Sequence, residues 1–243
     1  MDWKCLNQNP VFYFRHFQSK HYWWDNNDLS KIMRTRLEGK LSLDRWGTQL
    51  RAGVENIKNY TYLANTSIPV KDSEGNVTGF KNNAAVRQHS GNIQIFTAML
   101  QQKLKVGIFH LDGEVAYQKS SEQDILPLPE LSAYGNLYMK FGLAKKVLQI
   151  EMGADVRYFS KYYAPDYSPV IGQFYNQNPD DKIEIGAFPI VNVYANLHLK
   201  RTRFFIMMYH VNAGSGKSNY FLAPHYPINP RMIKFGLSWN FFD

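Results

Sequence analysis

The sequence predicts an all-β protein, an antiparallel up-and-down transmembrane β-barrel of about ten strands. Three observations support this fold class: apolar and polar residues alternate strictly over strand-length segments, short turns alternate with long polar segments, and the last strand has one wholly apolar side. A strand in a membrane barrel needs one apolar side toward lipid and a second side toward the interior. The 243 residues suit one domain, so we expect a single barrel domain over residues 1–243.

The C-terminal strand shows the alternation most clearly. One side of an extended chain carries Ile233, Phe235, Leu237, Trp239 and Phe241, and the other side carries small or polar residues. The pattern resembles the terminal strand that the outer-membrane assembly machinery recognises in barrel proteins. The residues that would form this assembly signal are Lys234, Gly236, Trp239 and Phe241. A half-buried strand of a soluble sheet is the alternative, but soluble proteins avoid large exposed apolar faces on almost every strand.

The same period of two recurs from a first expected strand at 11–18 onward. Outward-facing side chains are expected to include Leu37, Leu41, Leu137, Phe141, Ile150, Met152, Leu197 and Leu237. In two less regular segments we expect the apolar side to be formed by Ile93, Ile95, Thr97 and Met99, and by Phe205, Met207, Tyr209 and Val211. The pattern therefore predicts almost no helix.

The connections between these segments also alternate. Short turns are expected at 45–47, 102–105, 144–146 and 200–202, and long polar segments at 19–30, 64–87, 119–130, 160–186 and 213–230. Short turns on one side and long loops on the other are typical of barrels in the outer membrane of Gram-negative bacteria. We therefore expect the long loops to be extracellular and the C-terminus periplasmic. Expected aromatic girdles contain Trp46, Phe205, Trp239 and Phe241 at the periplasmic side, and Tyr62, Tyr117, Tyr158 and Phe159 at the outer side.

Composition is compatible with this location. The mean hydropathy of −0.41 is low, but in a barrel apolar and polar residues average out along each strand. The net charge of +8 is spread over turns and strand sides, so we expect no nucleic-acid partner. The single Cys5 excludes an intrachain disulfide, and the His residues are scattered, so neither a metal nor another cofactor is expected.

The N-terminal residues contain no export signal, because no basic stretch precedes an apolar one. An exported barrel requires such a signal. We therefore expect the chain to be the C-terminal part of a larger barrel.

Three segments carry a family resemblance. Residues 9–25 read NPVFYFRHFQSKHYWWD, residues 158–175 read YFSKYYAPDYSPVIGQFY, and residues 220–239 read YFLAPHYPINPRMIKFGLSW. They resemble the putative porin family of outer-membrane β-barrels in Bacteroides-like bacteria. The resemblance covers nearly the whole chain and the C-terminal portion of a typical member. It implies a barrel architecture, an outer-membrane location and lipid as a partner, and it names no substrate.

Charged residues on the polar strand sides are the candidate functional residues. The expected lumen-lining residues are Arg34, Arg36, Glu38, Lys40, Arg51, Glu55, Asp112, Glu114, Glu151, Asp155, Arg157 and Lys234. In a pore, such residues set the field that selects solutes, which predicts a porin-like protein for passive diffusion or transport of small polar solutes. Alternatively, they pair across strands and fill the interior, as in a structural or ligand-binding barrel without an open pore.

Two further features of the sequence bear on its chemistry. His110, Asp112 and Glu114 share one strand side, but no serine lies in a suggestive context near them, so we expect no enzymatic activity. The loop at 158–177 is rich in Tyr and Phe. Its aromatic rings would either stack on sugars or a partner outside the cell, or fold inward and pack on one another.

Overall fold

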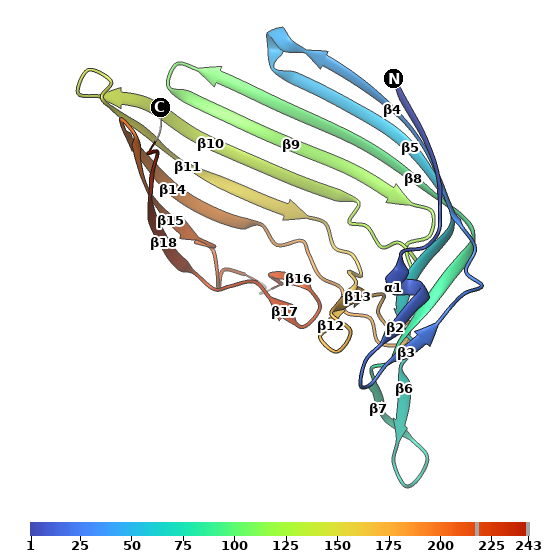
Figure 1. Cartoon of the computed structure of the whole chain (residues 1–243). Coiled ribbons are helices and arrows are strands. Elements are labelled where there is room, and N and C mark those ends of the chain that lie inside the picture. Colours follow the sequence, from blue (N-terminus) through green and yellow to red (C-terminus); the bar gives the residue numbers. More distant parts are fainter. Residues whose placement is uncertain (217–218, 242–243) are drawn as a thin grey trace.

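A computed structural model describes residues 1–216 and 219–241, so the terminal Phe242 and Asp243 of the predicted last strand lie outside the described residues. The molecule is built around one curved ten-stranded sheet (Figure 1). In spatial order the strands are β1 (Asp2–Gln8), β4 (Ile32–Leu43), β5 (Thr48–Asn65), β8 (Ala84–Val106), β9 (Phe109–Ser120), β10 (Leu131–Leu143), β11 (Leu148–Phe159), β14 (Ile190–Leu199), β15 (Thr202–Tyr209) and β18 (Met232–Trp239).

Every neighbouring pair in this sheet is antiparallel, which confirms the predicted all-β, up-and-down arrangement. Within the described ranges, no strand pairs with the outer edge of β1 or with that of β18. The sheet is therefore open and trough-shaped, with β1 and β18 as its two edges (Figure 1).

The strand register separates an apolar face from a polar face. Leu137 lies opposite Leu111 and Ala154, whereas the preceding Asn136 lies opposite Asp112 and Asp155. Since paired residues project to the same side of a sheet, these pairs belong to opposite faces. The pairing across the whole sheet gives one apolar face. It contains the predicted outward-facing residues Leu37, Leu41, Leu137, Phe141, Ile150, Met152, Leu197 and Leu237. Leu137 is 57% exposed there, so this face lacks a covering layer.

Two segments were predicted with the wrong side facing outward. Phe96 and Leu100 of β8 pair with Val54 and Leu50 on the apolar face, so the polar face instead receives Ile93, Ile95, Thr97 and Met99. In β15 the apolar face is formed by Phe204, Ile206 and Met208, and the polar face receives Phe205, Met207 and Tyr209. Val211 lies beyond the end of β15. Phe205 therefore does not belong to a lipid-facing girdle. Both strands carry apolar residues on both sides, so hydrophobicity alone did not identify the outward side.

The predicted first strand at 11–18 is also wrong. Asp2–Gln8 forms the edge strand β1, and after the buried Pro10 the chain turns into the one-turn helix α1 (Phe12–Arg15). The hairpin of β2 (His16–Gln18) and β3 (Trp23–Asp25) follows. In this segment the aromatic residues pack on the end of the sheet rather than alternating between its faces.

The turns at one end of the trough are short, as predicted, although one of them lies a few residues later in the sequence than expected. Between β4 and β5 lies the 3-10 turn η1 (Asp44–Trp46), closed by Gly47 at φ 62°. The turn expected at 102–105 is instead formed by residues 107–108, where Gly107 has φ 60°. A glycine tolerates this left-handed conformation without strain, which allows the tight reversal.

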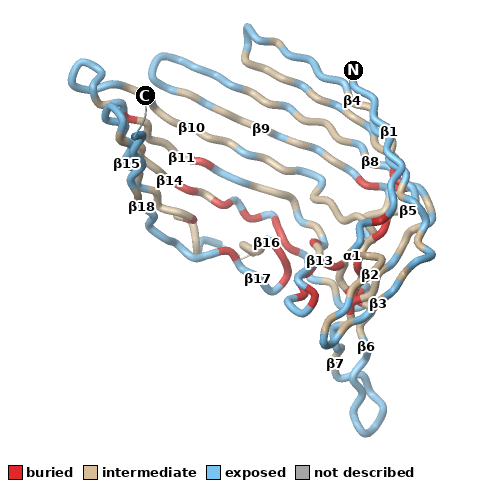
Figure 2. Tube along the Cα trace, viewed as in Figure 1, coloured by how far each residue is buried: buried red, intermediate tan, exposed pale blue. Residues whose placement is uncertain are grey.

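The opposite end of the trough carries the longer connections, several of which contain small hairpins. Much of the expected loop at 64–87 is strand, since β5 and β8 extend into it and the hairpin of β6 (Ile68–Lys71) and β7 (Val77–Lys81) projects from the sheet (Figure 1). The hairpins β12 (Asp166–Ser168) with β13 (Gln173–Tyr175) and β16 (Phe221–Ala223) with β17 (Tyr226–Pro227) lie in the later loops. Buried residues gather at this end (Figure 2). Among the described residues, no helix is long and apolar enough to cross a membrane.

Candidate functional site

The register brings the charged residues predicted from the sequence onto the polar face, but in two separate groups. Four basic residues, Arg34, Arg36, Lys40 and Arg51, lie on β4 and β5 together with Glu38 and Glu55. The acidic residues Asp112, Glu114, Glu151 and Asp155 lie on β9 and β11, where they are accompanied by Arg157. Lys234 lies alone on β18, over the ring of Tyr209. The polar face therefore has a largely basic part and a largely acidic part.

Most carboxylates of this face have a partner on a neighbouring strand, whereas Glu38 pairs with Arg36 on its own strand β4. Arg34 pairs with Glu55, and Arg36 pairs with Glu38. On the acidic side, the Asn192 amide donates to Asp155 at 2.8 Å. In the same way the Gln101 amide donates to Glu114 at 2.6 Å, and Lys140 lies 3.8 Å from Glu151. The expected alternative of cross-strand pairing thus applies to much of the set.

A long connection crosses the polar side of the trough. Residues 160–186, which we call the strap, join β11 to β14, yet the strap reaches β5. Asn65 N donates to Asn176 O at 2.8 Å, and Asn176 N donates to Leu63 O at 2.8 Å. Because β8, β9 and β10 lie between β5 and β11 in the sheet, the strap must span those strands.

The strap packs on the N-terminal segment through an aromatic cluster. Ile171 and Tyr175 are buried against the ends of β5 and β8, together with Tyr13, Phe17 and Trp24. The Tyr13 hydroxyl donates to Ile171 O at 2.9 Å, and the rings of Phe17 and Trp24 stack at 4.6 Å. Burial, and secondarily the nearby Asp166, raise the pKa of Tyr175 to about 12. Of the two alternatives for the aromatic loop, the structure favours inward packing.

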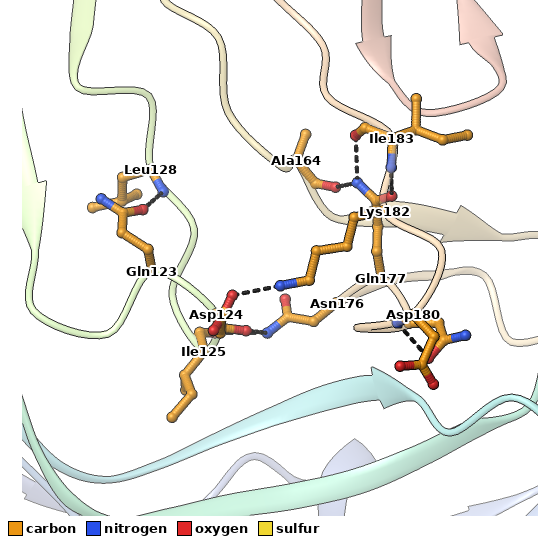
Figure 3. Close-up of polar contacts among 11 residues, drawn as sticks. Gln123, Asp124, Ile125, Leu128, Ala164, Asn176, Gln177, Asp180, Lys182 and Ile183 are labelled. Atoms are coloured by element: carbon orange, nitrogen blue, oxygen red, sulfur yellow. Dashed lines mark hydrogen bonds and ion pairs between the residues drawn. The ribbon is translucent and has the colours of Figure 1, made fainter.

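A second loop, residues 121–130, joins β9 to β10 and contacts the strap, and we call it the roof loop. The Asn176 amide donates to the backbone oxygens of Asp124 at 3.1 Å and Ile125 at 2.8 Å, and Lys182 Nζ lies 2.5 Å from Asp124 (Figure 3). Within the roof loop, Leu128 N donates to Gln123 at 3.0 Å (Figure 3). These bonds join the roof loop to the strap, and the strap is in turn fixed to β5.

The roof loop covers a cavity of about 360 Å³ on the basic part of the polar face. We call it the arginine pocket. Its walls include Arg34, Arg36, Glu55, Thr97 and Gln118, and the roof loop supplies Leu126 and Leu128. Gly53 also lines the pocket and leaves the surface of β5 bare there, because it has no side chain.

A second hollow of about 380 Å³ lies near the short-turn end. It is lined by Lys140, Glu151, Asn196, His198 and Arg203, and the Arg203 guanidinium donates to Asn196 at 2.8 Å. Of these residues, only Glu151 was among the predicted site residues. Asn196 and His198 fall on the polar side of the alternating pattern, and that signal alone could have identified them. Asn176, Lys182 and the roof loop had no comparable signal, because they act through contacts distant in sequence.

The other candidates have structural partners. The His110 ring stacks on Tyr138 at 4.9 Å. Among the described residues, no three His, Cys, Asp or Glu side chains gather in a way that could hold a metal ion. Gly236 of the proposed assembly signal makes room for Phe205, since a Cβ added there would lie 2.5 Å from its ring.

An antiparallel sheet with one continuous apolar face and one charged face has the strand architecture of outer-membrane β-barrel proteins. The chain matches the family described as "Putative porin" over residues 2–243 and belongs to that family. This membership confirms the resemblance to the putative porin family. No curated protein matches the chain.

Solved receptor structures share the fold. The ferric enterobactin receptor PfeA from Pseudomonas aeruginosa, in complex with enterobactin, is 13% identical, with a TM-score of 0.60 over 97% of this chain and 37% of the receptor. The siderophore receptor PirA from Acinetobacter baumannii is 10% identical, with a TM-score of 0.57 over 97% and 35%. A chain of the FpvAI–pyocin S2 complex is 14% identical, with a TM-score of 0.58 over 98% and 30%. The chain therefore spans about a third of the length of these proteins, and at such identities the likeness concerns the fold alone.

Proposed function

We propose that the chain forms part of the wall of an outer-membrane barrel that passes small polar solutes. Its apolar face lies against lipid, and its charged face lines the lumen. The observation that carries the proposal is the register, which keeps every predicted lumen charge on one face and the lipid-facing leucines on the other. A lumen lined by both charge signs selects solutes by its field, and the protein has no catalytic role.

The proposal also includes the orientation of the chain in the outer membrane and its place in a larger barrel. The long connections are extracellular and the C-terminus is periplasmic, with Lys234, Gly236, Trp239 and Phe241 as the assembly signal. The chain is the C-terminal part of a larger barrel. Two observations support this view: the sheet is open, and the chain covers about a third of each receptor with the same fold.

The strap favours a second candidate function, a ligand-binding barrel without an open pore. It crosses the trough on its polar side and is tied to the roof loop, so it would narrow the passage. Such a barrel would hold a solute on the same charged face without passing it freely.

Conductance across a planar lipid bilayer tests the pore function. We expect the refolded 243-residue chain to give small channels or none, because its sheet is open, and the longer gene product to give steady channels. Large stable channels from the 243-residue chain would contradict the proposed larger barrel. No channels from the longer product would favour the ligand-binding alternative.

A further inference from the structure

We propose that the arginine pocket binds a small organic solute through a carboxylate group. The inference rests on the proposed function and names a class of solute for the same charged face. It starts from the two guanidinium groups of Arg34 and Arg36, which line a cavity between β4, β5 and the roof loop.

The exposed charge in this pocket is positive. The side chains of Arg34 and Arg36 are 50% and 48% exposed, whereas that of Glu55 is only 10% exposed. The acidic partners neutralise the arginines in part, but the guanidinium groups face the open space. The neighbouring Lys40 and Arg51 on the same face add to a positive field, which attracts anions.

Both arginines retain hydrogen-bond donors for a ligand. Arg34 contacts Glu55 through Nε, and Arg36 contacts Glu38 through one terminal nitrogen. A guanidinium has five N–H donors in a planar fork that matches the two oxygens of a carboxylate. A lysine at either position would supply the charge without this geometry.

The rest of the pocket fits a short carbon skeleton. Ile57, Ile95, Leu126 and Leu128 provide apolar walls, and Thr97 and Gln118 add polar groups at one side. A volume of about 360 Å³ is at the small end of the range for ligand pockets. An inorganic anion would leave the leucines and isoleucines without a contact, which favours an organic anion.

The strap positions the roof of the pocket. Two hydrogen bonds from Asn176 and the ion pair between Lys182 and Asp124 hold the loop that carries Leu126 and Leu128 (Figure 3). Asn176 is therefore a positioning residue, because it acts on the pocket through the roof loop. Its removal should loosen the apolar wall and leave the arginines in place.

Calorimetric titration of the detergent-refolded 243-residue chain tests the proposal with three probes: succinate, its uncharged analogue succinamide, and inorganic phosphate. We expect succinate to bind more tightly than either of the other probes. The double variant Arg34→Gln, Arg36→Gln should bind succinate at least about tenfold more weakly, because two charge-assisted contacts are lost. The single variants Arg34→Lys and Arg36→Lys should show smaller losses and keep the preference over succinamide.

A matched control and a positioning variant complete the design. Arg87→Gln removes the same charge from β8, outside the pocket, and should leave succinate affinity unchanged. Asn176→Ala should weaken succinate binding several-fold, with less change in phosphate binding. Circular dichroism confirms that each variant keeps its strands, and the lysine variants remain informative if the double variant does not fold.

The inference would be overturned by no succinate binding by the unsubstituted chain, by equal affinity for succinate and succinamide, or by equal succinate affinity in the double variant. Phosphate binding as tight as succinate binding would also overturn it, since the site would then accept any anion. The titration needs no membrane, so succinate binding combined with no channels from the longer gene product would refute only the pore function. Channels without succinate binding would refute only the arginine pocket.

Discussion

At the scale of single residues, the two faces of the sheet impose opposite demands on neighbouring side chains. Leu137 and Asn136 are adjacent in β10, yet Leu137 belongs to the apolar face and Asn136 to the polar one. A charge placed on a lipid-facing side chain must leave water, whereas a charge on the lumen side remains hydrated. Adjacent positions should therefore differ strongly in their tolerance of arginine.

We predict that Leu137→Arg lowers the free energy of unfolding by about 2–4 kcal/mol in lipid vesicles, as expected for arginine at mid-membrane depth. Asn136→Arg should cost little. Ile150→Arg and Gln149→Arg form a second pair with the same expectation. Urea-induced unfolding, followed by tryptophan fluorescence, measures the four values. Equal costs within the pairs would refute the assignment of the faces.

Glycine matters most where the neighbouring strand leaves no space for a side chain. Gly153 lies opposite Tyr138 on one side and Tyr194 on the other, and a Cβ added there would lie 2.6 Å from Tyr138 Cβ. We predict that Gly153→Ala destabilises the chain by about 1–3 kcal/mol through overpacking. At Gly113 the nearest atoms lie 4.0 Å away, so Gly113→Ala is the matched control in the same unfolding assay. A similar cost at both positions would contradict this steric explanation.

The sequence identified most faces correctly because most strands are apolar on one side only. It failed for β8 and β15. Ile95 and Met99 lie on the polar face of β8 while Phe96 and Leu100 lie on the other, so both sides are apolar in sequence. Ile95 contributes to the arginine pocket, which gives an apolar residue a reason to face inward. Local alternation contains no information about such a pocket.

At the scale of elements, the projecting hairpin β6–β7 depends on a carboxylate in its turn. Hydrogen bonds from the backbone of Asn76, and secondarily from Asn76 Nδ2, Glu74 and Gly75, lower the pKa of Asp72 below its ordinary value. A lowered pKa in the folded state means that this carboxylate stabilises the turn above its unfolded pKa. The contribution is lost as the pH falls through the folded pKa.

We predict that the tip of the hairpin loosens in strongly acidic solution before the sheet does. Amide exchange at Gly75 and Asn76, measured by NMR against pH, should rise beyond its intrinsic pH dependence as Asp72 protonates. Asp72→Asn keeps a side-chain oxygen but cannot ionise, so its hairpin should lack this transition. A transition of the same size in the variant would exclude Asp72 as its origin.

Element boundaries were predictable where turns are short and ambiguous where aromatic residues cluster. The turn predicted at 45–47 lies at residues 44–47 in the structure. Residues 11–18, in contrast, were predicted as a strand and form the helix α1 and the strand β2. In that segment the side chains of Tyr13 and Phe17 bury themselves on residues of the strap, more than a hundred positions away. The packing partner, rather than local propensity, decided the conformation there.

At the scale of the whole molecule, the open edges should be the least protected parts of the sheet. Strands β9 and β10 have neighbours on both sides, whereas β1 and β18 each pair on one side only. We predict by hydrogen exchange of the detergent-refolded chain that β9 and β10 exchange slowest and that β1 and β18 exchange fastest. Protection of β1 and β18 equal to that of β9 would mean that the two edges pair with each other or with a second copy.

The order of nine sheet strands, from β4 to β18, followed from the sequence, but the edge strand β1 and the cross-connections did not. Antiparallel neighbours in a meander are close in sequence, so their pairing is local information. The bridge between Ala64 and Asn176 joins residues far apart in the chain, and no period or motif marks it. The roof loop and the arginine pocket depend on this bridge, so they too required the three-dimensional structure.

The strap has a mechanical consequence for an unclosed sheet. A connection that joins two distant strands of a curved sheet restrains its curvature, even where the sheet is not closed. Residues 160–186 join the flank at β11 and β14 to the flank at β5 and limit how far the two can separate. The strap therefore helps to set the curvature of this sheet without requiring a closed barrel. In the proposed larger barrel, further strands would therefore pair with β1 and β18 of a sheet that is already curved.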